Sequence, residues 1–173
     1  EDITDYFGVA SIDEAVELRK SGISIPILIL GYNSPSLYEM NLLYDIDQTI
    51  YSIETAKAMS ETAKRTGKRA RIHIALDTGM TRIGFSADEE GLAAVKEIAA
   101  LPNIHLEGLF THFSCADMTD KAYTHQQMER YDHCVDMLEE AGITIPVKHI
   151  CNSAGIMEFD HHRYDMVRAG IND

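Results

Sequence analysis

A polar stretch, Asp77-Thr78-Gly79-Met80-Thr81-Arg82-Ile83-Gly84-Phe85, directly follows an alternating apolar run at residues 70–76. The alternation is typical of a strand directed into a core. In parallel α/β proteins ligands bind at the carboxyl ends of the strands, so polar groups at this exit indicate a candidate site. The alternative is an ordinary strand exit with a glycine turn and a solvated arginine. The stretch alone does not choose between the two.

The same strand pattern recurs on both sides of this stretch, with helical patterns in between. Strands are expected at 6–10, 26–31, 48–52, 70–76, 106–113, 147–153 and 164–171. Helices are expected at 11–21, 37–43, 53–65, 86–100 and 121–141, with a further short helix after Ser153. Ser11 and Ser86 each begin an S-x-x-E capping box, and Ser34 precedes a first-turn proline.

Strands that alternate with helices in this way predict right-handed βαβ units and a parallel sheet. A doubly wound sheet would carry a glycine-rich loop after its first strand, and residues 7–11 do not form one. The sequence therefore predicts an α/β fold of the TIM (β/α)8 barrel type, as a single domain over residues 1–173. The barrel is incomplete here, with about seven βα units where the complete fold has eight. The missing first strand is expected upstream, because the chain begins without Met.

Composition narrows the class of protein. A net charge of -13 argues against nucleic acid as a partner, because such binding depends on clustered Lys and Arg. No apolar run reaches the length of a membrane span, and the acidic start is not a signal peptide. Three cysteines without C-x-x-C spacing fit a reducing cytoplasm. The histidines show no metal-binding spacing, and the adjacent pair His161-His162 would point apart, so no metal site is predicted.

Polar residues follow the other late strands as well as the strand at 70–76. In a barrel these exits converge on one mouth. Asn152 and Ser153 precede a short helix and could hold an anion, while Gly170 would let backbone N–H groups approach a phosphate. If a strand is missing upstream, these are the exits of strands seven and eight, the common phosphate site of such barrels. The alternative is an ordinary helix cap and a turn glycine.

Arg168 lies between apolar neighbours in the last predicted strand, and His112 and His149 lie at strand ends. A buried arginine must be paired or hydrogen-bonded, because an isolated buried charge is very costly. Each histidine taken alone is more often a core residue than a catalytic one. Together with the phosphate residues, these three groups favour a cofactor pocket.

Four motifs occur in order along the chain: Asp-Thr-Gly-Met-x-Arg-x-Gly at 77–84, Thr-His-Phe at 111–113, His-x-x-Asn-Ser-Ala at 149–154, and Val-Arg-x-Gly-Ile at 167–171. In these motifs the chain resembles the barrel domain of the alanine racemase family, which comprises fold-type III pyridoxal-phosphate enzymes. The likeness covers essentially the whole chain, and the first motif is the most specific.

The resemblance implies a role for each matching residue. Arg82 would bind the phenolic oxygen of pyridoxal phosphate, and Arg168 would contact the pyridine nitrogen, with His112 as the neighbour that positions it. The phosphate would be held by Ser153, Gly170 and Ile171, and Asn152 and His149 would line the site. Because a guanidinium keeps its proton near neutral pH, Arg168 would leave the pyridine nitrogen largely unprotonated and so limit side reactions such as transamination.

Three departures from the family pattern bear on activity. The lysine that anchors the cofactor in this family lies on the first strand, and no matching motif occurs here. The second base is a tyrosine from the C-terminal β domain of the partner subunit, which is expected after Asp173. No catalytic base is therefore assigned within residues 1–173, and the segment alone is expected to be inactive. Many relatives carry a lysine, often carboxylated, in place of Ala75, and that group supports the arginine aligned with Arg82.

The resemblance implies a cytoplasmic, homodimeric enzyme that interconverts L- and D-alanine, a small amino-acid substrate, and supplies D-alanine for the cell wall. A serine racemase or another amino-acid racemase of the same family is the first alternative. A non-catalytic pyridoxal-phosphate carrier on the same barrel and a vestigial barrel segment are the others.

Overall fold

A computed structural model describes residues 4–160 and 163–170 of the chain. Its frame is a parallel sheet in which the strands stand in the order β1-β2-β3-β4-β6-β7. A doubly wound sheet would reverse its order near the middle, whereas this sequential order is the one that a barrel requires. The fold is thus an open α/β part-barrel, as predicted. The strands are β1 Phe7–Val9, β2 Ile27–Ile29, β3 Asp47–Ile50, β4 Ala70–Asp77, β6 Ile104–Phe110 and β7 Val147–His149, and β5 Phe85–Ser86 pairs with β4.

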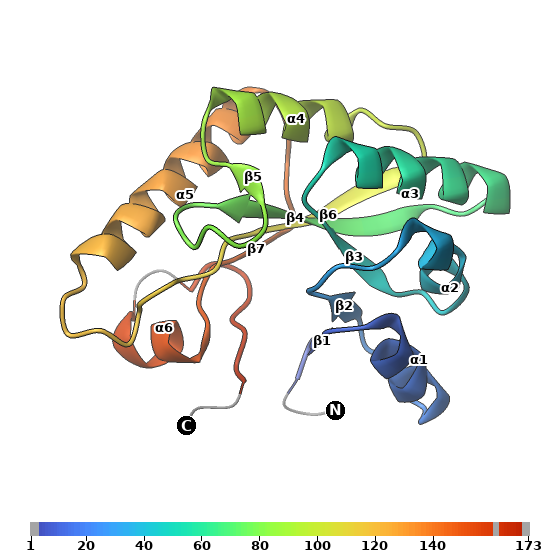
Figure 1. The fold of residues 1–173 in the computed structure, drawn as a ribbon, viewed down its shortest axis with the longest axis horizontal. Helices are drawn as coiled ribbons and strands as arrows, with labels where there is room; N and C mark the ends of the chain where they lie inside the picture. The colour runs from blue at the N-terminus through green and yellow to red at the C-terminus, as the bar shows by residue number, and fades with distance from the viewer. Residues whose placement is uncertain (1–3, 161–162, 171–173) are drawn as a thin grey trace.

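Helices cover the outer side of the sheet (Figure 1). Three long helices, α3 Ile53–Thr66, α4 Glu89–Ala99 and α5 Ala122–Glu140, pack in sequence over the centre of the sheet. The other helical elements are α1 Ile12–Lys20, the 3-10 turn η1 Pro35–Leu37, α2 Tyr38–Leu43 and α6 Ser153–Glu158. On the described residues, no helix is long and apolar enough to cross a bilayer.

Local sequence signals explain most helix ends. The predicted capping box at α1 is confirmed, because Ser11 Oγ accepts from the Glu14 N–H and Glu14 Oε2 accepts from the Ala10 N–H. Gly67 ends α3 in the left-handed conformation, at φ 66°. Ser34 makes no capping hydrogen bond, and Pro35 begins the 3-10 turn η1; the predicted short helix follows it as α2.

The predicted cap at Ser86 is wrong by two residues. Ser86 is still extended in β5, beside Asp77 of β4, so it cannot begin a helix. The cap is Asp88, which accepts from the Gly91 N–H at 3.0 Å and from the Ser86 hydroxyl at 2.6 Å. A side chain at residue 91 would lie 1.8 Å from the Ser86 carbonyl oxygen, so this tight entry to α4 requires glycine.

The seventh predicted strand, 164–171, is not a strand in its described part, and Ile171 lies outside the described residues. Asp165 and Met166 donate backbone hydrogen bonds to Lys148, and Arg168 donates one to Cys151. A regular ladder does not form because β7 ends at His149 and the chain then turns into α6. Arg168 therefore lies in an irregular extended segment and not in the middle of a strand.

The main apolar core lies between the sheet and its helices. Ile72, Ile74 and Leu76 of β4 point into it, and alternation along the strand directs His73 and Ala75 to the inner face. A smaller cluster joins α1 to β2. The first predicted strand is less buried than expected, because β1 pairs only with β2 among the described residues and leaves Gly8 exposed.

Candidate cofactor site

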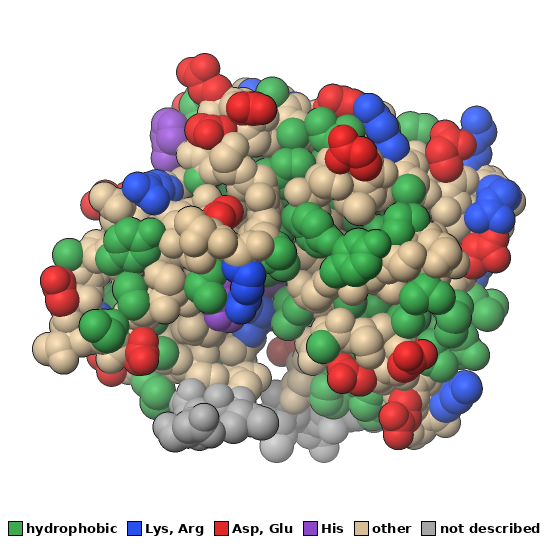
Figure 2. All heavy atoms as spheres, viewed as in Figure 1, with side chains coloured by type: hydrophobic (Ala, Val, Ile, Leu, Met, Phe, Trp, Pro, Cys, Tyr) green, Lys and Arg blue, Asp and Glu red, His purple; other side chains and the backbone are tan. Residues whose placement is uncertain are grey.

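A cavity of about 1430 Å³ opens on the inner face of the sheet, around the exits of β4, β6 and β7. Figure 2 shows the hollow, with blue and purple side chains along its margin. One wall comes from Tyr6, which precedes β1, and from β1 and β2, including Leu28, and the opposite wall from residues 163–170. Among the predicted site residues, those that line the cavity are Arg82, His112, Asn152, Ser153, Arg168 and Gly170.

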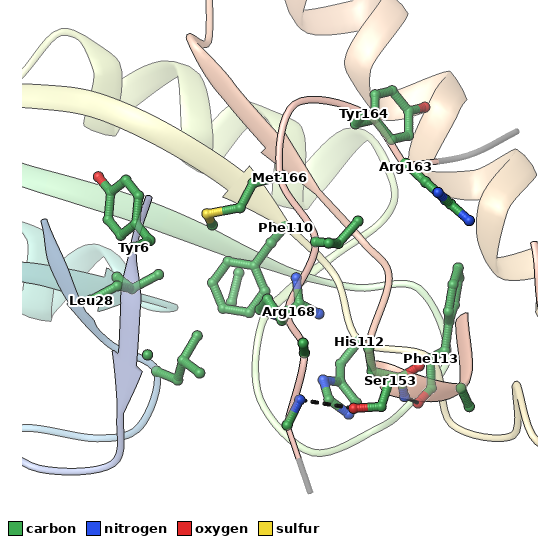
Figure 3. Close-up of a pocket in the computed structure, with 18 of the residues that line it drawn as sticks. Tyr6, Leu28, Phe110, His112, Phe113, Ser153, Arg163, Tyr164, Met166 and Arg168 are labelled. Carbon is green, nitrogen blue, oxygen red and sulfur yellow. Dashed lines mark hydrogen bonds between the residues drawn. The ribbon is translucent and has the colours of Figure 1, made fainter. Parts of the chain in front are cut away.

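Arg168 lies at the centre of the close-up in Figure 3. Its Nη1 lies 2.7 Å from Nδ1 of His149, and its Nη2 donates to the Thr111 carbonyl oxygen at 2.8 Å. Its guanidinium carbon also lies 5.2 Å from the centre of the Phe110 ring, a cation–π distance. Burial lowers the pKa of Arg168 to about 10, with a smaller contribution from the charge of Arg82. The guanidinium therefore keeps its charge at neutral pH.

His149 stands behind Arg168 and does not line the cavity. Its side chain is fully buried, and its ring stacks on Phe110 at 4.8 Å between centres. Burial, together with the charge of Arg168, holds the pKa of His149 well below the usual value. The imidazole is thus neutral, and it contacts the cavity only through the guanidinium.

Ser153 and Gly170 meet at the same end of the cavity. The Gly170 N–H donates to Ser153 Oγ at 2.9 Å, the dashed contact beside Ser153 in Figure 3. Asn152 has the structural role that the alternative interpretation gave it, because its Oδ1 caps α6 by accepting from the Gly155 N–H. The Ser153 hydroxyl and the Gly170 backbone N–H are therefore the groups at this end that could bind an anion.

His112 and Arg82 complete the polar lining. Burial lowers the pKa of His112 to about 4, and the charges of Arg168 and Arg82 add to the effect. The charges of Arg82 and Arg168 therefore both act on the imidazole of His112. Among the described residues His112 makes no hydrogen bond to Arg168, so His149 and the backbone carbonyl groups fix the guanidinium.

The loop that carries Arg82 is firmly held, although the arginine itself is not. Asp77 Oδ1 accepts from the N–H groups of Gly79 and Thr81, both at 2.9 Å. Gly84 has φ 134°, and a side chain there would lie 2.6 Å from the backbone nitrogen of Asp77. The side chain of Arg82 is exposed and makes no hydrogen bond or ion pair within the described part of the chain.

Ala75 is buried and lines the cavity, so a longer side chain at this position would enter the site. The lysines of this chain all fall within the described residues, and none of them lines the cavity. The described residues also contain no cluster of three His, Cys, Asp or Glu side chains that could hold a metal ion. His161 and His162 lie outside the described residues.

Sequence reasoning missed Gln127, a fully buried side chain on α5. Its Nε2 donates to Thr78 Oγ1 at 3.2 Å and to the His112 carbonyl oxygen at 3.1 Å. Its Oε1 accepts from the Ser114 N–H at 3.1 Å. Gln127 thus joins the exits of β4 and β6, and the only local signal was a polar residue at a position facing the core.

The assembled groups suit an anionic molecule. A fixed guanidinium faces the cavity, a hydroxyl and an amide lie at one end, and a second arginine enters from the β4 loop. Arginine and backbone or hydroxyl donors are the usual partners of phosphate and ring acceptors.

Comparison with known proteins identifies the family. A sequence model described as "Alanine racemase, N-terminal domain" matches residues 1–172. An alanine racemase of Clostridium tetani is 47% identical over 163 residues, which cover 94% of this chain and 42% of that protein. The chain thus spans less than half the length of this relative.

Comparison with solved structures supports the same family. An alanine racemase of Clostridium difficile 630, in complex with cycloserine, matches at 45% identity with a TM-score of 0.96, over 98% of this chain and 47% of that chain. A histidine racemase of Leuconostoc mesenteroides matches at 30% identity with a TM-score of 0.86, over 98% of this chain and 45% of that chain. The chain belongs to the alanine racemase family, and the part of the family that it matches is the N-terminal domain.

Proposed function

We propose that this chain is the cofactor-binding barrel of an alanine racemase, which interconverts L- and D-alanine with pyridoxal phosphate. The observation that carries the proposal is Arg168, a fixed cation that faces a cavity with a hydroxyl and an amide at one end. Pyridoxal phosphate, when bound, supplies the electron sink that makes the α-proton of an amino acid removable. The residues around the cavity hold and orient that group.

Arg168 would donate a hydrogen bond to the pyridine nitrogen. Its two Nη groups donate to His149, Thr111 and Ile150 and hold the guanidinium from behind, so among the described residues Nε–H is the donor left for the cofactor. With a pKa of about 10, the arginine does not transfer its proton at neutral pH. It therefore positions the ring without acidifying it, whereas a carboxylate at this place would favour a protonated ring.

Ser153 and Gly170 would hold the phosphate, together with Ile171. At present the Ser153 hydroxyl accepts from the Gly170 N–H, and both groups lie on the cavity wall. An anion could take both as donors, because a hydroxyl can rotate its proton toward a new acceptor. Arg82, which has no other partner in the described part of the chain, would reach the phenolic oxygen.

The two bases that remove and return the α-proton would come from outside residues 1–173. No described lysine lines the cavity, and Tyr6 donates its hydroxyl proton to the buried Asp47. We infer an anchoring lysine elsewhere in the polypeptide and a tyrosine from a second subunit, which makes the active form a homodimer. The sequence holds three cysteines without C-x-x-C spacing, which supports a cytoplasmic location.

A racemase for another amino acid is the second candidate. The match to a histidine racemase of the same fold supports it, because barrel geometry alone evidently serves more than one substrate. Serine is a further substrate of suitable size.

The full-length protein tests these proposals directly. With pyridoxal phosphate it should convert L-alanine to D-alanine, measured by coupled oxidation of the D-isomer, faster than it converts L-serine or L-histidine. A faster turnover of either of these would favour the second candidate, and no racemisation of any amino acid would contradict both.

The role of Arg168 has a separate test. Arg168→Glu should raise the ratio of transamination to racemisation, because a carboxylate stabilises a protonated pyridine ring. Arg168→Gln removes the guanidinium without adding a carboxylate and serves as the matched control. An unchanged ratio in Arg168→Glu would count against the role.

A further inference from the structure

Three fully buried polar side chains form a line beneath the cofactor site. Asp47 of β3, His73 of β4 and His149 of β7 all lie on the inner face of the sheet. Nδ1 of His73 lies 3.0 Å from Nε2 of His149. Nε2 of His73 faces Asp47 Oδ2 at 3.7 Å and Tyr6 Oη at 3.5 Å. With the contact from His149 to Arg168, these side chains run from the cavity along the inner face of the sheet to β3.

The contacts determine where each imidazole proton lies. A guanidinium can only donate, so Nδ1 of His149 must accept from Arg168 and carries no proton. A neutral His149 then carries its proton on Nε2 and donates it to Nδ1 of His73. His73 in turn carries its proton on Nε2, directed toward Asp47. All donors thus point the same way, from Arg168 to Asp47.

The far end is anchored by charge. Arg71 donates from Nε to Asp47 Oδ1 at 2.8 Å, and Tyr6 donates to Asp47 Oδ2 at 2.6 Å. Burial alone would raise the pKa of Asp47, but hydrogen bonds from His73, Tyr6 and Arg71 outweigh it and leave the pKa below its usual value. Asp47 is therefore a fixed acceptor for the line.

The backbone makes room for this arrangement. A side chain at Gly108 of β6 would lie 2.0 Å from Nδ1 of His73. The pairing of β4 with β6 also shifts register between Ile72 and His73. An apolar residue would fill the space at less cost than a buried imidazole, which must find partners for both nitrogen atoms. The glycine and the bulge thus accommodate a histidine that the core itself does not need.

We propose that His73 and Asp47 are positioning residues for Arg168, and that they act through His149 by fixing which of its nitrogen atoms carries the proton. If His149 carried its proton on Nδ1, it would oppose the guanidinium and displace it from the cavity. The inference rests on the proposed function, in which Arg168 contacts the cofactor ring. Neither His73 nor Asp47 touches that ring.

Two variants of His73 separate positioning from packing. His73→Asn places a carbonyl oxygen near the position of Nδ1 and keeps an acceptor for His149. His73→Leu has similar volume and no acceptor. His133→Leu, at an exposed histidine on α5, is the control. Each variant is prepared as the full-length protein with ¹⁵N-labelled histidine, with and without pyridoxal phosphate labelled at the pyridine nitrogen.

Wild type, His73→Asn and His133→Leu should show one His149 tautomer, with the proton on Nε2. His73→Leu should show a mixture of tautomers and a shifted pyridine ¹⁵N signal, because the His149 N–H has lost its acceptor. We expect kcat to fall about tenfold in His73→Leu with KM changed less, and to recover in His73→Asn.

A single Nε2–H tautomer in folded His73→Leu would overturn the proposal, as would an Nδ1–H tautomer or a cationic His149 in wild type. The wild-type measurement needs no variant, so the proposal stays testable if His73→Leu does not fold. The tautomer is read without cofactor. Failure of wild type to bind pyridoxal phosphate would therefore contradict the proposed function and leave the tautomer result standing.

Discussion

Nη1 of Arg168 lies 2.7 Å from Nδ1 of His149, so a cavity-lining cation is oriented by a histidine that the cavity does not reach. The arginine comes from an irregular segment and the histidine from the end of β7. The same guanidinium also bonds carbonyl oxygens of Thr111 and Ile150. Arg168 therefore ties the last described segment to two strand exits, and its position depends on all of them.

Unfolding stability should depend on pH through His112. Its pKa is lowered to about 4 in the folded chain, so between its ordinary value of 6.5 and pH 4 the unfolded state binds more protons. Stability is therefore full above about pH 6.5 and falls as the pH drops toward 4, with a slope of at most about 1.4 kcal/mol per pH unit for one group. Solvent screening of this partly exposed ring reduces the slope.

His112→Gln should flatten this dependence, measured by urea unfolding at several pH values. Buried His149 contributes with the same sign and remains in the variant. His133→Gln, at an exposed histidine, should leave the slope unchanged. Equal slopes in His112→Gln and wild type would show that His112 titrates normally.

Gln127→Glu should destabilise the protein by about 2–4 kcal/mol, because both side-chain donors of a buried amide are lost. The carboxylate would also face the His112 carbonyl oxygen without a proton between them. Gln126→Glu, at the exposed neighbouring position, should change stability by less than about 0.5 kcal/mol. Similar unfolding midpoints for the two variants would remove Gln127 from its assigned role at the strand exits.

Gly108→Ala should cost about 1–3 kcal/mol or more, because the new methyl group would overlap the buried ring of His73. Gly142→Ala is the control for backbone strain alone. Residue 142 has φ 78°, and a side chain there would have nothing within 4 Å. The midpoint temperature of thermal unfolding should therefore be well below that of Gly142→Ala for Gly108→Ala. The reverse order would mean that the strand can move away from His73.

Ala75→Lys should restore an anionic partner for Arg82 when bicarbonate is present. The side chain would enter the cavity from β4, where its amine could be carboxylated. We expect a carbamate signal in ¹³C NMR with labelled bicarbonate, and tighter binding of pyridoxal phosphate than without bicarbonate. Ala75→Met, of similar length but uncharged, should respond to neither. A lysine that stays a free amine would repel Arg82 and weaken binding instead.

Much of the fold could be predicted from local patterns. Three local patterns each predicted one element, and the structure confirms all three. They are the alternation at 70–76, the S-x-x-E signal at Ser11 and the helical pattern at 121–141. The prediction failed where an element depends on its neighbour. Residues 164–170 have the composition of a strand, yet β7 ends too early to pair with them. Ser86 has the signal of a cap, yet β5 holds it extended.

The candidate site, like the fold, could be predicted from the sequence only in part. The sequence by itself determined which residues follow the strand exits, because parallel strands bring their carboxyl ends to one face and the motifs at Arg82, His112 and Ser153 follow those ends. Arg168 reaches the same cavity from an irregular segment, which the sequence did not predict. Only the tertiary structure decided how they act on one another. His149 lies behind Arg168, Asn152 caps α6, and Gln127 hydrogen-bonds to the exits of β4 and β6. These roles depend on hydrogen bonds between residues far apart in the chain, and sequence spacing carries no signal for such distances.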